Sequence, residues 1–163
     1  MSLRTQASAA QLDRDAPEVR AWARLLRAHA ALTRRFSSQL LEAHGLTLND
    51  YEVLLHLAHA PERRLRRVDL AEQVLLTPSG VTRLLSGLER AGYVDRAACD
   101  TDARVTYAVL TEDGHEKLRE AAPTHLGGIR ELFSDLYAPD ELATLAGLLE
   151  RLPALASPEC DAA

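Results

Sequence analysis

The spacing of apolar residues along the chain predicts a mostly helical protein. From Pro17 to Ala43, apolar positions recur three and four residues apart, which is typical of one long amphipathic helix that ends at Gly45. A second, shorter helix is expected after Thr47, because Asp50 three residues later is typical of a capped helix N-terminus. The first segment is about twice the average helix length of ~11 to 12 residues. We therefore expect part of it to pack on a partner subunit.

The middle of the chain predicts two short helices joined by a tight turn. Apolar spacing from Val68 to Leu75 gives about two helical turns. A further helix is expected to begin after Thr77, which suits an N-cap, and Pro78 occupies the first helical position, where proline is tolerated. Two helices connected in this way are the signature of a helix-turn-helix.

The pattern changes after this pair of helices. The β-prone pieces Tyr93 to Ala97 and Val105 to Leu110 flank a polar stretch, which predicts a hairpin with an exposed tip. Helix resumes at Thr111, with Pro123 expected to kink it, and a last helix is expected from near Pro139. The fold class predicted from these patterns is mainly α with a small β-hairpin.

Composition and charge narrow the function classes. The 163 residues, 47% hydrophobic and 26% charged, fit one globular domain, and the net charge of −5 argues against a protein that coats nucleic acid by bulk charge. The charge is uneven: residues 63–104 carry eight Arg against six acids, a net of +2, whereas residues 105–163 have a net of −7. A local basic surface thus remains available, although a coding bias toward arginine explains the many Arg residues equally well.

Several classes of protein are not expected. No apolar run reaches the roughly 18 residues of a membrane span, and residues 1–16 lack the apolar core of a secretory signal, so we expect a cytoplasmic protein. Residues 1–16 and 153–163 are expected to be disordered tails. Common catalytic motifs are absent from the sequence, and we expect neither an enzyme nor a cofactor. Cys99 and Cys160 alone make no disulfide framework and no zinc site.

The segment 65–114 resembles the MarR family of winged-helix transcription regulators. The matching stretches are LAE at residues 70–72, LTPSGVTR at 76–83, LERAGYV at 88–94, DAR at 102–104 and LTEDG at 110–114. The resemblance, which extends over residues 17–152, implies the order helix, helix, short strand, two helices, strand, wing, strand, helix, helix. It implies a winged helix-turn-helix DNA-binding domain at 46–110 and dimerisation helices at 17–45 and 111–152. The family often has two Arg at the wing tip, and Ala103 stands at the first of these positions here.

DNA contacts are expected on the second helix of the helix-turn-helix and on the wing. Such a helix reads bases with its first turns, and Arg83 can contact guanine through two hydrogen bonds. On the wing, Arg104 would enter the minor groove with Asp102 orienting its guanidinium, unless the two form only a surface ion pair. Arg66 belongs to a basic run, Arg63, Arg64, Arg66 and Arg67, that suits either a phosphate clamp or a solvated loop. The expected DNA contacts are Thr77, Ser79, Gly80, Thr82, Arg83, Ser86, Arg66, Asp102 and Arg104.

Two further sites are expected, a dimer interface and a ligand crevice. One reading helix covers few base pairs, so a two-fold dimer on a pseudo-palindromic site is expected. The interface candidates, some of which could be intrachain core instead, are Trp22, Leu26, Phe36, Leu40, Leu145 and Leu149. The resemblance implies a repressor released by a small aromatic or phenolic anion. The candidates for binding it, for each of which alone a structural role is favoured, are Trp22, Arg24, His29, Tyr51 and His56.

Other roles for these residues are less favoured. His56 and His59 lack an evident third ligand, so no metal site is expected. Cys99 lies on the expected wing, whereas the peroxide-sensing branch of the family keeps its reactive thiol on the first helix, so redox sensing is not expected. The alternative function is a winged-helix module for protein contacts that does not read DNA. Arg83 and Arg104 favour DNA, whereas an apolar or acidic face on the same helix would favour protein.

Overall fold

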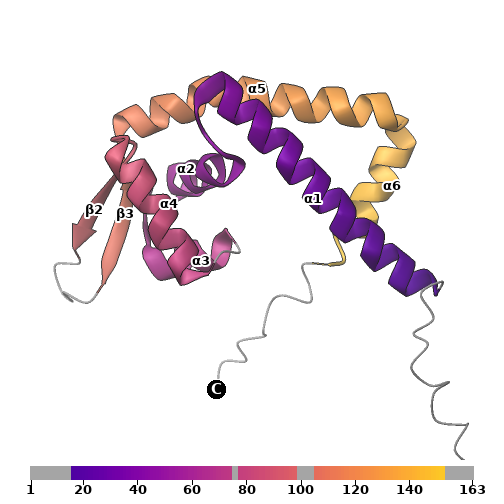
Figure 1. Cartoon of the computed structure of the whole chain (residues 1–163), viewed down its shortest axis with the longest axis horizontal. Coiled ribbons are helices and arrows are strands. Elements are labelled where there is room, and N and C mark those ends of the chain that lie inside the picture. Colours follow the sequence, from indigo (N-terminus) through magenta and orange to yellow (C-terminus); the bar gives the residue numbers. More distant parts are fainter. Residues whose placement is uncertain (1–15, 75–76, 99–104, 153–163) are drawn as a thin grey trace, which may run out of the picture.

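The computed structural model describes residues 16–74, 77–98 and 105–152, and these form a mostly helical molecule with a small antiparallel sheet (Figure 1). This confirms the predicted fold class. In chain order the elements are α1 (Pro17–His44), α2 (Leu48–His59), the 3-10 turn η1 (Pro61–Arg63), β1 (Arg64–Arg66), α3 (Arg67–Gln73), α4 (Pro78–Arg90), β2 (Val94–Ala98), β3 (Thr106–Leu110), α5 (Glu112–Leu136) and α6 (Pro139–Leu149).

The helices begin and end at the residues that the sequence marks for this purpose. Gly45 ends α1 in the left-handed region, with φ of 70°, where glycine avoids the steric cost of a Cβ atom. At the start of α2, the Asp50 N–H donates to Thr47 Oγ1 at 3.2 Å and the Thr47 N–H donates to Asp50 Oδ2 at 2.8 Å, forming the predicted capping box. Thr77 caps α4 in the predicted way by accepting a hydrogen bond from the Gly80 N–H at 3.2 Å.

Three short strands form one sheet with the order β1-β3-β2. Both pairings with β3 are antiparallel, with Leu65 opposite Ala108 on one side and Arg96 opposite Ala108 on the other. β1 falls within the basic run, where Leu65 is the one residue of the strand that is not exposed. This single inward side chain explains why hydrophobic periodicity alone gives little signal for the strand.

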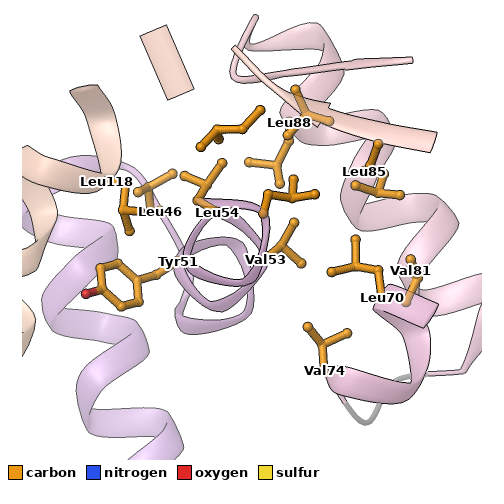
Figure 2. Packing of buried hydrophobic residues seen from close by; sticks show 14 of the residues in the cluster. Leu46, Tyr51, Val53, Leu54, Leu70, Val74, Val81, Leu85, Leu88 and Leu118 are labelled. Atoms are coloured by element: carbon orange, nitrogen blue, oxygen red, sulfur yellow. The ribbon is translucent and has the colours of Figure 1, made fainter. Parts of the chain in front are cut away.

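The hydrophobic core surrounds α2, as Figure 2 shows. Val53, Leu54 and Leu57 on this helix are fully buried. The neighbouring helices contribute further buried side chains, namely Leu70, Val74, Val81, Leu85, Leu88 and Leu118. α4 therefore rests on a packed support, which holds its outer face in a defined direction.

The long helices α1 and α5 pack against each other. Gly128 of α5 is buried there, and a Cβ atom on it would collide with the side-chain amide of Gln39 on α1. The His44 Nε2 and Thr124 Oγ1 atoms, 2.8 Å apart, add a hydrogen bond between the same helices. α5 is one continuous helix that includes Pro123, and the kink expected at this residue stays a prediction.

The N-terminal half of α1 and the whole of α6 contribute no buried residue to the core (Figure 1). Large apolar side chains are exposed on them and at the end of α5, namely Val19, Trp22, Leu25, Leu26, Leu136, Tyr137, Leu148 and Leu149. Phe36 and Leu40 of the expected dimer interface differ, because they are buried by the chain itself and belong to its own core. Among the described helices, none combines the length and apolar character needed to cross a membrane.

Candidate nucleic-acid interface

The outward face of α4 is polar and carries no acid until its last turn. Val81, Leu85 and Leu88 point into the core, so the opposite face, with Ser79, Thr82 and Arg83, is exposed. The first acidic residue of the helix is Glu89. The N-terminal turns therefore combine the positive end of the helix dipole with the exposed guanidinium of Arg83, which together attract phosphate.

The expected base-reading residues on α4 differ in whether their polar side-chain groups already have hydrogen-bond partners within the protein. Arg83 has no hydrogen bond or ion pair to any described residue, so its guanidinium is available. Thr77 already caps the helix, and its hydroxyl lies 3.2 Å from that of Ser79. Ser86 donates to the Thr82 carbonyl oxygen at 2.9 Å, within the helix. Arg83 is thus the best placed to reach a base edge, and Gly80 near it is half-buried.

The four arginines of the basic run all have carboxylate partners. The pairs are Arg63 with Glu112 at 3.0 Å, Arg64 with Glu62 at 2.5 Å, Arg66 with Asp69 at 2.6 Å and Arg67 with Glu89 at 3.9 Å. Both Nε and Nη2 of Arg66 donate to Asp69, and this carboxylate raises the pKa of the guanidinium further above its usual range. A phosphate contact by Arg66 remains a prediction, and it would have to compete with or share Asp69.

The wing begins with β2 and β3, and its tip lies outside the described residues. Asp102, Ala103, Arg104 and Cys99 all fall there, as do residues 1–15 and 153–163 of the expected tails. Arg96 on β2 is exposed and its Nη2 lies 3.2 Å from Glu89 Oε2, which joins the strand to α4.

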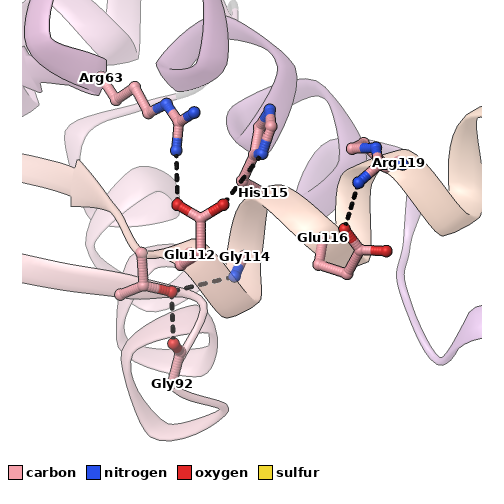
Figure 3. A network of polar contacts seen from close by, with 8 residues as sticks. Arg63, Gly92, Glu112, Gly114, His115, Glu116 and Arg119 are labelled. Atoms are coloured by element: carbon pink, nitrogen blue, oxygen red, sulfur yellow. Dashed lines mark hydrogen bonds and ion pairs between the residues drawn. The ribbon is translucent and has the colours of Figure 1, made fainter.

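A polar network joins the base of the wing to the start of α5 (Figure 3). Thr111 donates to the Gly92 carbonyl oxygen at 2.7 Å and accepts from the Gly114 N–H at 3.0 Å. Glu112 accepts a hydrogen bond from Arg63 at 3.0 Å, and His115 Nδ1 lies 3.7 Å from the same carboxylate. The end of α4, the turn before β1 and the first turn of α5 are thereby held together.

The turn before β1 is locally strained. Glu62 and Arg63 both have left-handed backbones, with φ of 53° and 52°, a conformation that costs a residue with a Cβ atom about 1 to 2 kcal/mol. The ion pairs of Arg63 with Glu112 and of Arg64 with Glu62 span this turn.

An aromatic cluster lies where α1, α2 and α5 meet. The His125 ring is 5.4 Å from the Phe36 ring, edge to face, and 4.7 Å from the Tyr51 ring. His125 Nδ1 is buried without a hydrogen-bond partner, and burial lowers the pKa of this imidazole. Burial also raises the pKa of Tyr51.

The five expected ligand residues do not form one cluster within a subunit. Trp22 and Arg24 are exposed on the first turns of α1, whereas Tyr51 is 4% exposed and buried against His125. Trp22 precedes Phe36 by roughly 20 Å along the helix axis, at about 1.5 Å per residue. His29 and His56 are closer to each other, since both lower the pKa of Glu52, which burial raises by a larger effect. Their role in ligand binding stays a prediction.

Arg67 of the basic run holds the interface in place together with two residues that sequence reasoning did not single out, Glu89 and Arg96. Glu89, Arg67 and Arg96 link α4 to α3 and β2. The acid in the last turn of α4 was a usable signal, because the helix dipole disfavours a negative charge there. The identity of its partners was not readable from sequence, since Arg67 is more than twenty positions away and depends on the fold.

Comparisons with known proteins agree with this geometry. The model of the MarR family matches residues 44–105. An HTH-type transcriptional regulator of Bacillus cereus is 30% identical over 132 residues, covering 80% of this chain and 85% of that protein. The HTH-type transcriptional repressor YetL of Bacillus subtilis is 32% identical over 111 residues, which is 66% of each chain. The crystal structure of Sco3205, a MarR family transcriptional regulator from Streptomyces coelicolor, in complex with DNA, is similar with a TM-score of 0.77 and 30% identity, covering 85% of this chain and 87% of that one.

Proposed function

The chain belongs to the MarR family of DNA-binding transcriptional regulators, and we propose that it reads a pseudo-palindromic duplex site as a homodimer. The observation that carries this proposal is the outward face of α4, where Arg83 is exposed and unpaired among described residues and no acid precedes Glu89. Because a bidentate arginine contact distinguishes guanine from other bases, Arg83 is the main sequence reader. The solved relative in complex with DNA supports this use of the fold.

The proposed homodimer is supported by two complementary surfaces. The first turns of α1 expose an apolar stripe that includes Trp22, Leu25 and Leu26. The α5–α6 corner has an open groove of about 270 Å³, lined in part by Leu145, Leu148, Asp140 and Glu141. An exposed apolar stripe fits a groove with apolar lining, so we place α1 of one copy on the α5–α6 corner of the other.

The alternative, a module that contacts only proteins, is less well supported. We expect such a module to present an apolar or acidic surface on α4. The exposed residues of this face are instead Ser79, Thr82 and Arg83. The relatives are regulators and not enzymes, in agreement with the sequence-based expectation.

Repression and release by a small molecule form the finer part of the proposal. A relative named as a repressor supports repression. Because the partner is DNA, we place the activity in the cytoplasm. For release, the ligand would be a small aromatic anion near α1 and α2, with His56 supplying a cation or hydrogen bond. Benzoate and 4-hydroxybenzoate are suitable probes. Dissociation of the DNA complex by millimolar benzoate, but not by acetate, would support this part, and no effect of either aromatic probe would count against it.

A selection experiment tests the reading of DNA. The wild-type protein is incubated with a pool of random duplexes, and the retained fragments are sequenced. We expect two inverted half-sites, and Arg83→Ala should lose ~1 to 3 kcal/mol of affinity and relax preference at one base pair in each half-site. Arg90→Ala, on the last turn of the same helix, is the matched control and should leave the preference unchanged. No enrichment by the wild-type protein would reject the proposal.

A further inference from the structure

The only acidic residue of α4 occupies a place that the helix itself disfavours. Glu89 lies in the last turn, where the negative end of the helix dipole repels a carboxylate. Its side chain is only 25% exposed, so it has also lost part of its hydration. A carboxylate in this position needs compensation from nearby cations.

Two arginines from different elements supply that compensation. Arg96 on β2 places Nη2 at 3.2 Å from Glu89 Oε2 and 3.5 Å from Oε1. Arg67, the first residue of α3, places its Nη2 at 3.9 Å from Glu89 Oε1. We call Glu89, Arg67 and Arg96 the ion-pair triad. It joins the two helices of the helix-turn-helix to the first strand of the wing.

Arg67 depends on this arrangement. Its side chain is 21% exposed, and its Nη2 atom is buried without a hydrogen-bond partner. Within the described residues, Glu89 supplies the only carboxylate paired with it. Loss of the carboxylate would leave a partly buried cation without a counter-charge, and the side chain would then gain by turning toward solvent or toward another anion.

We propose that Glu89 is a specificity-determining residue that acts by positioning the triad. It holds α3, α4 and β2 in one arrangement, and it keeps two guanidinium groups from binding phosphate. This inference rests on the proposed DNA binding. Phosphate contacts strengthen binding to every sequence, whereas base contacts by α4 distinguish sequences. Arginines that are engaged within the protein therefore lower the background affinity, and a fixed wing keeps the α4 contacts in register.

The test compares binding to two duplexes at several salt concentrations. One duplex is the site selected by the wild-type protein, and the other is a scrambled duplex of the same composition. For Glu89→Gln, fluorescence anisotropy should show about tenfold tighter binding to the scrambled duplex and less than threefold change on the selected site. On the scrambled duplex, the slope of log affinity against log salt concentration should become more negative by about one to two. Each new phosphate contact adds roughly 0.9 to the magnitude of this slope.

A matched control removes the same charge without touching the triad. Asp95 is an exposed neighbour of Arg96 on β2 and has no ion pair to any described residue. Asp95→Asn should shift both affinities by similar, small factors and keep their ratio within twofold of wild type. Glu89→Asp retains the charge but shortens its reach, so it should weaken binding to the selected site without tightening binding to the scrambled one.

A double variant separates charge from position. Glu89→Gln with Arg96→Gln restores the wild-type net charge, so affinity for the scrambled duplex should return toward the wild-type value. The ratio of the affinity for the selected site to that for the scrambled duplex should stay about tenfold below the wild-type ratio. If Glu89→Gln fails to fold by circular dichroism, Arg96→Gln alone should still lower affinity for the selected site more than for the scrambled one. Equal changes on both duplexes, or the same loss of ratio in Asp95→Asn, would overturn the inference. A wild-type protein that selects no site would instead reject the proposed function.

Discussion

At the scale of single residues, Gly114 determines how closely α5 approaches the wing. A Cβ atom here would collide with the carbonyl oxygen of Tyr93 and would lie 2.9 Å from a methyl group of Leu110. The backbone carbonyl cannot move without disturbing the end of α4, because the Tyr93 N–H donates to the Leu88 carbonyl oxygen at 3.0 Å. Only glycine therefore allows this contact between the helix and the strand.

We expect Gly114→Ala to lower the free energy of unfolding by about 1 to 3 kcal/mol, the cost of forcing extra volume into a packed site. Gly127→Ala, on the same helix, is the control, because a Cβ atom there meets nothing within 4 Å. It should raise stability by up to ~1 kcal/mol, since alanine favours helix more than glycine does. Denaturant titrations measure both values, and a stable Gly114→Ala protein would contradict the close contact.

His125 makes stability depend on pH. Burial lowers the pKa of its imidazole, so the unfolded chain, with a histidine pKa of about 6.5, takes up the proton first. Stability is therefore full above about pH 6.5 and falls as the pH drops from there toward the folded-state pKa. His125→Phe keeps a ring beside Phe36 and Tyr51 but cannot titrate.

We expect His125→Phe to be less sensitive than wild type to acidification between about pH 7 and 5.5, measured by thermal unfolding. Glu52 acts in the opposite direction, because burial raises the pKa of its carboxyl and the folded state then takes up the proton first. Glu52→Gln is therefore the comparison variant, and it should leave the decline below pH 6.5 in place. Identical pH profiles for wild type and His125→Phe would show that His125 is not responsible.

At the scale of elements, α1 serves two purposes along its length. Its C-terminal half carries Phe36 and Leu40, which are buried in the chain's own core, whereas Trp22 and Leu26 on its first turns are exposed. The apolar repeat is the same in both halves, so periodicity predicted the face of the helix but not what covers it. The groove on the α5–α6 corner is the proposed partner of the exposed half.

We expect Leu26→Asp to convert the dimer to monomers, because an unpaired carboxylate in an apolar interface costs several kcal/mol. Light scattering after size-exclusion chromatography measures the mass. The contrasting variant Leu40→Ala removes core packing and should lower the free energy of unfolding by about 2 to 5 kcal/mol. A wild-type protein that stays monomeric at high micromolar concentration would reject the homodimer.

The order and ends of the elements were predictable because local chemistry sets them. Gly45, Thr47 and Thr77 act through residues within four positions, and such signals are visible in any window of sequence. The polar links are different: Arg63 pairs with Glu112, forty-nine positions later, and Thr111 bonds to Gly92. Pairs of this kind depend on the folded backbone and could not be predicted. The pairs of Arg64 with Glu62 and of Arg66 with Asp69 join near neighbours and were within reach of the sequence.

At the scale of the whole molecule, the proposed homodimer requires the two copies of α4 to face the same side of the duplex. Half-sites about one helical turn apart, ~10 bp, satisfy this geometry. Inserting five base pairs between the half-sites should abolish binding, because the second copy would then meet the opposite side. Inserting about ten base pairs, a full helical turn, brings the second half-site back to the same side of the duplex and should recover part of the affinity. Equal affinity for all three duplexes, measured by gel shift, would contradict a rigid two-fold reader.

The length of α5 has a mechanical consequence for such a dimer. The helix has 25 residues, which span about 37 Å at 1.5 Å per residue, and it is bonded to the wing at one end and reaches the α5–α6 corner at the other. A stiff rod of this length acts as a lever. A tilt of about 5° at the corner would displace the far end by roughly 3 Å, comparable to the rise of one base pair, ~3.4 Å. In the proposed homodimer, a small adjustment between subunits would thereby change the register of α4 on the DNA.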